Sequence, residues 1–356
     1  MKRNTAETRR RLLAFLGAIP VSFCSDLSKA EPKKLELSSY FHGEILPVNG
    51  AQLFADKATK DSAGTIRVSL EEVPPWVPLK MMSKASALAH YCAPDVANIE
   101  PIFGLSAVPM LTATFDEAET LLRIARPYYS SALARHGQIL LATQPWRPVA
   151  LWSTFRIRSV ADLQGSPFPI SSYVGEQAGW GRTFVRLGAR QASLSEAEFV
   201  LSSGYTADMK FSREFAYFTE IFLAAQLNFL TISHNVFAFL TEAQRHVLVA
   251  TGRSTELSQW SLQRKLVHHD HHEIVARGVH VAVQAPSDVL ATLRTAAEPD
   301  IQGWAESVGE DGMAILTDYR RAVCREWPTT AAARIAASLR CSRKATRASQ
   351  VFGNRS

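Results

Sequence analysis

Cysteine is scarce in this chain, with four among 356 residues, and this scarcity excludes two structural solutions. Cys92, Cys324 and Cys341 lie far apart in the sequence, and none of them belongs to a Cys-x-x-Cys pair. A disulfide framework and a structural zinc site both need closely spaced cysteines, so neither is expected. The spacing allows a single bridge between Cys92 and Cys324 in an oxidising compartment, but it does not require one.

Long apolar runs are missing too, apart from a short one near the N-terminus. Residues 12–23 are apolar, follow Arg9-Arg10-Arg11 and are too few to span a bilayer. Ser28-Lys29-Ala30 then places small residues at the two positions that a signal peptidase reads. We therefore expect residues 1–30 to be an export signal of the Sec or twin-arginine type, and the mature chain to be periplasmic without stable membrane insertion. The alternative is a basic amphipathic N-terminal helix.

Acidic residues are absent from the C-terminal end, and this absence locates the net charge of +6. Residues 1–30 carry six Lys or Arg against two acidic residues, residues 331–356 carry six against none, and residues 31–330 carry 27 against 31. The excess positive charge thus lies at the two ends, so it gives no reason to expect nucleic acid as a partner. Residues 331–356 are expected to form a basic, disordered tail.

Motifs of common enzymes are missing as well. The chain has no Gly-x-Ser-x-Gly, no phosphate-binding loop and no cysteine with a convincing base partner, so a periplasmic enzyme lacks support and no catalytic residue is predicted. The segment from His268 to Glu273 suggests a metal, because His268 and His272 would share a helix face. No third ligand follows nearby, so we expect a solvated helix face and predict neither metal nor cofactor.

From Lys34 onward the chain alternates strand-like and helix-like segments, which is typical of α/β folds. The predicted strands are 34–41, 65–70, 95–99, 138–142 and 279–283. The predicted helices are 49–63, 80–92, one that starts at Thr114, and 288–308. A run without proline over 241–277 predicts one long helix or two abutting helices, with Gly252 as the internal weakness.

Two segments are predicted to connect two lobes. Pro145-Trp146-Arg147-Pro148 interrupts a strand-like region, and a strand broken by two prolines suits a crossing better than the centre of a sheet. Residues 229–240 are the predicted return crossing. We therefore expect the domains to be lobe I from residues 31–144 and 230–255, lobe II from 145–229, and a long helix with C-terminal elements across both lobes from 256–330.

The segment from Arg158 to Ile170, RSVADLQGSPFPI, carries a family resemblance. It resembles the "s-x-x-D-L-K-G-x-K-x-R" of the extracytoplasmic solute-binding proteins of TRAP transporters, the DctP-like family. Weaker matches in the same order cover residues 34–322, among them Val108-Pro109 and Glu196 with Gly204 and Asp208. The resemblance implies a type II periplasmic-binding-protein fold, with two α/β lobes joined by crossing strands and a long helix.

The same resemblance bears on the ligand. In the family, the closing arginine of this segment holds the carboxylate of an organic acid, but this chain has Pro169 there. An acid needs a fixed cation, so Arg147 is the first candidate replacement and Arg182 the second. Alternatively the ligand is neutral or weakly acidic and stacks on aromatic rings, those of Tyr40, Trp146 and Tyr173.

The cleft of a two-lobed binding protein is lined by loops at strand ends and by the crossing strands. The predicted ligand-binding residues are Tyr40, His42, Trp146, Arg147, Pro169, Ser171, Tyr173 and Lys210. Core packing is the alternative role of the three aromatic residues, and Glu196 is expected to orient backbone near the cleft. The expected function is capture of a small organic acid and its delivery to the membrane permease of a TRAP transporter. The alternative is an orphan or sensor-linked binding protein with a changed ligand.

Overall fold

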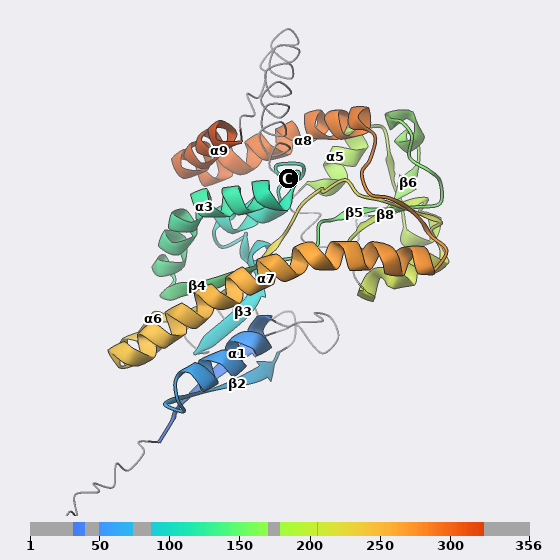
Figure 1. The fold of residues 1–356 in the computed structure, drawn as a ribbon. Helices are drawn as coiled ribbons and strands as arrows, with labels where there is room; N and C mark the ends of the chain where they lie inside the picture. The colour runs from blue at the N-terminus through green and yellow to red at the C-terminus, as the bar shows by residue number, and fades with distance from the viewer. Residues whose placement is uncertain (1–30, 40–49, 74–86, 170–178, 205, 324–356) are drawn as a thin grey trace, which may run out of the picture.

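The computed structural model describes residues 31–39, 50–73, 87–169, 179–204 and 206–323. The predicted export signal and basic tail, at 1–30 and 331–356, lie outside these residues. Two separate β-sheets, with helices packed on them, form the body of the molecule (Figure 1). No helix in the described ranges is long and apolar enough to cross a membrane.

The first sheet has five strands in the order β2-β1-β3-β10-β4. Strand β1 is parallel to β2 and β3, whereas β10 is antiparallel to both of its neighbours. Helix α1 (Gly50–Asp61) packs on β2 and buries Phe54 completely. The strands of this sheet are β1 (Lys33–Ser39), β2 (Ile66–Glu72), β3 (Leu88–Cys92), β4 (Gln138–Pro145) and β10 (Leu227–Ser233).

The second sheet has four strands in the order β11-β9-β5-β8. Strand β5 is antiparallel to β8 and β9, and β9 is parallel to β11. Trp152 of β5 is fully buried and lies edge-on to Phe218 of β9, with ring centroids 4.9 Å apart. These strands are β5 (Ala150–Ser153), β8 (Phe199–Ser202), β9 (Tyr217–Thr219) and β11 (His280–Ala282), and the pair β6 (Pro167–Phe168) and β7 (Arg190–Gln191) lies beside them.

The chain passes between the two sheets at residues 146–149 and again at 220–226, and the two crossings lie side by side. The amide of Trp146 donates to the carbonyl of Gln226 at 2.8 Å, and the amide of Val149 donates to that of Ala224 at 2.9 Å. The amide of Leu223 donates back to Val149 at 2.9 Å. Because these backbone hydrogen bonds run in both directions, the crossings form a narrow antiparallel connection between the lobes.

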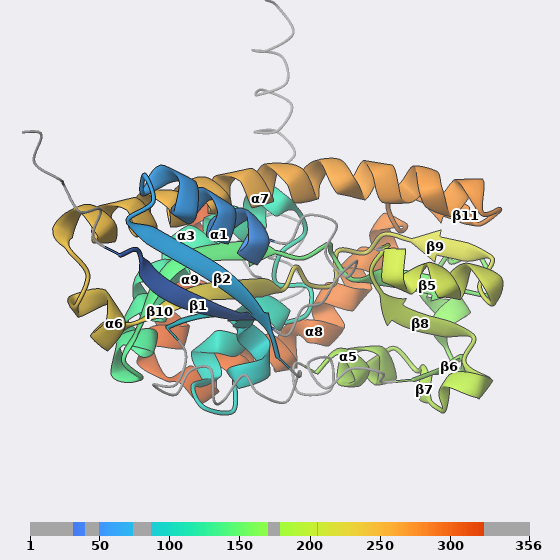
Figure 2. The same ribbon diagram turned by 90° about the horizontal axis from the view of Figure 1, so that it is seen from below.

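Helix α7 (Glu242–Ala276) also connects the lobes, as one helix of 35 residues. It starts at a capping box in which Thr241 accepts from the amide of Gln244 and the Gln244 side chain accepts from the amide of Thr241. At 1.5 Å per residue it is about 50 Å long. It packs on α1 and β4 at one end and near β11 at the other, so it runs along both lobes (Figure 2).

Gly252 is what lets α7 approach the first sheet closely. A Cβ at this position would lie 2.5 Å from the carbonyl oxygen of Leu141 in β4. Glycine lowers helix propensity, which makes this position a weakness in the sequence. The structure shows that close packing on β4 requires it.

The remaining helices surround the sheets. Helix α8 (Ser287–Val308) packs against α5 of the second lobe and against η3 and α9 of the first. Helix α3 (Phe115–Arg135) begins after Thr114, whose hydroxyl accepts from the amide of Glu117. The other elements are α5 (Trp180–Arg186), α6 (His234–Ala238), α9 (Glu310–Ala322), and the short 3₁₀ helices η2 (Ala93–Val96), η3 (Pro101–Ala107), η4 (Val160–Leu163), η5 (Leu194–Glu196) and η6 (Thr206–Arg213).

Three sequence-based assignments are wrong. The segment 80–92 was expected to be a helix, but Leu88–Cys92 is β3, with all five residues buried. A strand buried on both faces has no periodicity that separates it from a buried helix. The segment 95–99 was expected to be a strand, but a 3₁₀ helix occupies Ala93–Val96, where Pro94 at the start favours a helical turn. Residues 80–86 lie outside the described ranges.

The third wrong assignment is the return crossing. The segment 229–240 was expected to pass between the lobes, but residues 229–233 belong to β10 within the first sheet and α6 follows directly. The crossing is 220–226. Its first residue, Glu220, still bonds to Ala282 of β11, whereas Leu223, Ala224 and Gln226 bond to the first crossing. Its apolar residues Ile221 and Leu223 are buried, so the segment is apolar without being part of either sheet.

Candidate functional site

A chain of buried polar side chains lies at the edge of the first sheet, where the first crossing leaves it. The hydroxyl of Ser39 lies 3.2 Å from Nδ1 of His90, and Nε2 of His90 lies 3.1 Å from Oε1 of Gln144. Nδ2 of Asn228 is 3.4 Å from the same imidazole nitrogen, and Nε1 of Trp146 donates to Oδ1 of Asn228 at 2.7 Å. Strand register explains the cluster, because Ser39 pairs with His90 and Asn228 with Gln144.

This polar edge cluster carries no charge at neutral pH. Burial lowers the pKa of His90 to about 4, although its hydrogen bond to Gln144 opposes the shift. The imidazole is therefore neutral, and its partners are a hydroxyl and two amides. Such a set can hydrogen-bond a neutral polar group, but it offers no cation to a carboxylate.

Arg147, the first candidate cation, is neutralised by an ion pair with α7. Its Nε donates to Oδ2 of Asp270 at 2.5 Å and its Nη1 donates to Oε1 of Gln263 at 2.9 Å. The side chains of Arg147 and Asp270 are 4% and 5% exposed. Burial raises the pKa of Asp270, and the Arg147 guanidinium opposes this shift. Arg147 is therefore not a solvated surface residue.

The other predicted ligand-binding residues are only partly described. Trp146 is half-buried at the first crossing, and Pro169 is buried directly after β6. Lys210 is exposed on η6, with its ammonium 5.2 Å from the centre of the Phe211 ring. Tyr40, His42, Ser171 and Tyr173 lie outside the described residues.

Glu196 has a local structural role. Its carboxylate accepts from the amide of Ser193 at 3.2 Å and from the hydroxyl of the same residue at 2.8 Å. These bonds close the capping box of η5, and Glu196 is exposed. It therefore orients the backbone before β8, as expected, but through a turn of three residues.

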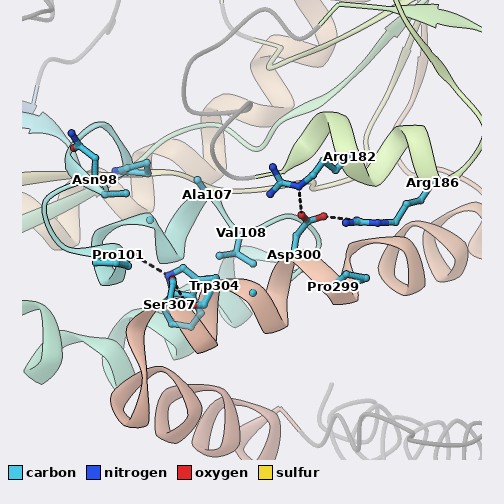
Figure 3. Close-up of a pocket in the computed structure, with 14 residues that line it drawn as sticks. Asn98, Pro101, Ala107, Val108, Arg182, Arg186, Pro299, Asp300, Trp304 and Ser307 are labelled. Carbon is cyan, nitrogen blue, oxygen red and sulfur yellow. Dashed lines mark hydrogen bonds and ion pairs between the residues drawn. The ribbon is translucent and has the colours of Figure 1, made fainter.

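A pocket of about 550 Å³ lies between the two lobes and α8 (Figure 3). The first lobe contributes η2, η3 and the residues beside them, and the second lobe contributes α5. Figure 3 shows two arginines of α5 on one side of the space and the first-lobe residues on the other. Its main side chains are Asn98, Val108, Arg182, Arg186, Asp300 and Trp304.

The two arginines share one buried carboxylate. Arg182 Nε donates to Oδ1 of Asp300 at 2.8 Å, and Arg186 Nη1 donates to Oδ2 at 2.5 Å. The Asp300 side chain is 3% exposed, whereas that of Arg182 is 58% exposed. Sequence reasoning named Arg182 and missed the other two residues. The i and i+4 spacing of the arginines was the available signal, since it places both on one helix face.

A second cavity, of about 760 Å³, lies beside the crossings and includes His268 and His271 of α7. His271 Nε2 is 3.1 Å from Oε1 of Glu220, on the second crossing. His268 and His272, the pair with metal-ligand spacing, are both exposed. In the part of the chain that the structure describes, no group of three or more His, Cys, Asp or Glu could hold a metal ion.

No protein-family model matches the sequence, and no curated protein sequence matches it. Solved structures do match the fold. An extracytoplasmic solute receptor of Bordetella pertussis that binds pyroglutamic acid aligns with a TM-score of 0.71 at 19% identity, over 81% of this chain and 99% of that chain. The chain has the fold of a TRAP solute-binding protein. The expected α/β, two-lobed type II fold is thus confirmed.

Other solved structures of TRAP solute-binding proteins also align with this chain. A TRAP periplasmic solute-binding protein from Ochrobactrum anthropi, with a C-terminus bound in its ligand pocket, has a TM-score of 0.72 at 17% identity, over 82% of this chain and 96% of that chain. One from Ralstonia eutropha, with bound (S)-2-acetolactate, has a TM-score of 0.67 at 15% identity, over 81% of this chain and 98% of that chain. The likeness therefore spans nearly the whole of each TRAP protein.

Proposed function

We propose that this chain is a periplasmic solute-binding protein that captures a small organic acid between its lobes and delivers it to a TRAP-type secondary transporter. The observation that carries the proposal is the likeness of fold, which covers 81% of this chain and 99% of a receptor for pyroglutamic acid. Export through residues 1–30 and docking on a membrane permease belong to the same proposal. The expected division into two lobes belongs to it as well, with the boundary after the second crossing moved from residue 229 to residue 226, because β10 starts at Leu227.

Hinge closure is the proposed mechanism, and it makes or breaks no covalent bond. A ligand that contacts both lobes stabilises the closed arrangement more than the open one. The two crossings at 146–149 and 220–226, together with α7, are the connections about which the lobes would move. We therefore propose no enzymatic activity.

The predicted ligand-binding residues now have more specific proposed roles. Trp146 offers an aromatic face at the crossing, with its ring nitrogen already bonded to Asn228. Arg147 holds the crossing to α7 through Asp270, rather than holding a ligand. Tyr40, His42, Pro169, Ser171, Tyr173 and Lys210 remain predicted contacts.

A second candidate differs in the ligand and the downstream partner. Pro169 stands where the TRAP family pattern has an arginine, and the polar edge cluster is uncharged because burial keeps His90 neutral. These observations favour an orphan or sensor-linked binding protein for an aromatic or weakly acidic compound.

A ligand screen by thermal unfolding tests both candidates. The purified chain is heated with pyroglutamate, 2-acetolactate, glucuronate and benzoate, and with the neutral amides of the same compounds. A ligand at 100 times its Kd adds about 2.7 kcal/mol to the free energy of unfolding, which raises Tm by several degrees. A rise in Tm with the acids but not with their amides supports the first candidate. A rise in Tm with the amides, or with benzoate alone, supports the second. No shift with any compound contradicts both.

A further inference from the structure

We infer that Arg182 and Arg186, oriented by Asp300, bind the carboxylate of the ligand in the pocket between η3, α5 and α8. This inference rests on the proposed function, and it names the cation that replaces the arginine absent at Pro169. The three side chains come from two helices that are more than 100 residues apart in the sequence, α5 and α8 (Figure 3).

The charge of the pocket wall favours an anion. Arg182 and Arg186 carry two positive charges, and Asp300 supplies one negative charge between them. The pocket wall therefore keeps a net charge of +1 from this group. Arg147 differs in this respect, because its ion pair with Asp270 joins one cation to one anion. An anionic ligand would complete the charge balance in the pocket, where a carboxylate is the planar group that best fits a guanidinium.

Arg182 can donate further hydrogen bonds to a ligand. Arg182 uses only its Nε in the bond to Asp300. Among the described residues, its two Nη nitrogens meet no hydrogen-bond acceptor, and 58% of its side chain is exposed. A guanidinium with two unused nitrogens can bind a carboxylate in bidentate geometry. Arg186 is more constrained, since its Nη1 donates both to Asp300 and to the carbonyl of Ala296.

Asp300 orients the two arginines. Asp300 accepts from Arg182, Arg186 and the hydroxyl of Thr183, the last at 3.2 Å, so its carboxylate fixes one face of α5. Gly179 has a φ of +86°, and a Cβ there would meet the carboxylate of Asp300 and Nη2 of Arg182, so a larger residue would disturb this ion pair. Guanidinium groups fixed in advance lose less conformational entropy when a ligand binds. Asp300 is therefore a positioning residue.

The rest of the pocket defines the class of ligand. Opposite the arginines lie Val108 and Pro101, and the ring nitrogen of Trp304 is occupied by the carbonyl of Pro101 at 3.0 Å. These groups present an apolar surface, and the polar side chains of Asn98 and Ser307 lie beside it. The volume of about 550 Å³ is within the usual range of small-molecule sites. The geometry thus fits a monocarboxylate with a small apolar or aromatic body.

The pocket also relates binding to the arrangement of the lobes. Trp180, the first residue of α5, donates from its ring nitrogen to the carbonyl of Ala107 in η3 at 2.7 Å. A ligand held by α5 that packs against Val108 would add a second contact between the same two elements. Its binding energy would then favour the arrangement in which α5 and η3 are close.

The test measures the Kd of the full chain for benzoate, pyroglutamate and their neutral amides by calorimetry. Arg182→Ala and Arg186→Ala are compared with Arg253→Ala, an exposed arginine of α7 outside the pocket. We expect each pocket variant to weaken binding of the acid at least tenfold and to change binding of its amide less, while the control matches the parent. Arg182→Lys keeps the positive charge but loses the bidentate guanidinium, so its Kd for the acid is expected to lie between those of the parent and Arg182→Ala.

A second variant separates loss of the site from loss of folding. Asn98→Trp alters an exposed residue on the opposite wall and leaves both arginines in place, so it is expected to weaken binding by filling the pocket. Unliganded Tm values show which variants fold. If the parent binds an acid and folded Arg182→Ala and Asn98→Trp bind it equally well, the inference is wrong and the proposed function stands. If the parent binds no acid or amide, both are wrong.

Discussion

The guanidinium of Arg147 and the carboxylate of Asp270 are joined at 2.5 Å in the interior, between the first crossing and helix α7. The two residues are 123 positions apart in the sequence. The ion pair therefore attaches the first of the two crossings to helix α7, which is the third connection between the lobes. Both side chains are at least 95% buried, so neither can exchange its partner for water.

Asp270→Ala is expected to destabilise the protein by about 3 to 5 kcal/mol, because it removes the buried carboxylate that forms an ion pair with Arg147. Equilibrium unfolding in urea measures the loss. His272→Ala, an exposed neighbour on the same helix, is the control and is expected to change stability by less than about 0.5 kcal/mol. A loss below about 1 kcal/mol for Asp270→Ala would show that water reaches Arg147.

Stability is expected to fall in mild acid because of His90. Its pKa is lowered to about 4 in the folded protein, below the value of 6.5 for an ordinary histidine. Between these two values the unfolded chain binds a proton that the folded chain does not, so stability is complete above pH 6.5 and decreases as the pH falls toward 4. The full difference corresponds to about 3 kcal/mol, at 1.36 kcal/mol for each pH unit.

The pH dependence can be assigned to one side chain by substitution. His90→Gln removes the titrating group, so the unfolding free energy of the variant should lose about 3 kcal/mol less than that of the parent between pH 6.5 and 4. Urea unfolding at several pH values provides the comparison, with exposed His272→Gln as control. Parallel curves for the parent and His90→Gln would exclude a buried neutral imidazole.

Gly252→Ala is expected to destabilise the protein, although alanine is the better helix former. Helix propensity alone predicts a gain of about 1 kcal/mol. The added Cβ would lie 2.5 Å from the Leu141 carbonyl, so α7 must move away from β4, at a cost of about 1 to 3 kcal/mol beyond that gain. A chemical denaturation curve decides the sign. Gly303→Ala in α8, where nothing lies within 4 Å, is the control and should be stabilised.

Trp146 allows its ring and its ring nitrogen to be tested separately. Trp146→Phe keeps an aromatic face but leaves Oδ1 of Asn228 without the donor at 2.7 Å, so it should cost about 1 to 3 kcal/mol of stability. If the ring stacks on the ligand, Trp146→Phe retains most of the affinity and Trp146→Ala loses it. Calorimetry with benzoate makes the comparison. Equal affinity for both variants would remove the ring from the site.

Local signals in the sequence were enough for much of the fold. Pro145 and Pro148 marked the first crossing, and the proline-free run after Thr241 marked α7, because proline removes a backbone donor wherever it occurs. The strand β3 was missed for the opposite reason. It is buried on both faces, so its apolar residues do not alternate.

The candidate site was less predictable, because its properties depend on contacts distant in the sequence. Arg147 was expected to hold the carboxylate of a ligand, because nothing near it in the sequence indicates the ion pair with Asp270, which only the fold brings to it. Asp270 belongs to the histidine-rich segment His268–Glu273, which suggested a metal site and not an ion pair. The pairing of Arg182 with Asp300 could not be predicted either, because the two residues are 118 positions apart in the sequence. The role of Glu196 could be predicted, because its partner Ser193 is three residues away.

Strand order in the two sheets has a consequence for biosynthesis. Strand β10 lies between β3 and β4 although it is made after β9, and β11 joins the second sheet only after α7. Neither lobe is a continuous stretch of chain, so a nascent polypeptide that stops before residue 227 lacks an inner strand of one sheet and an edge strand of the other. The first sheet therefore cannot be completed on the ribosome until residue 233 has been translated, and the second cannot be completed until residue 282 has been translated.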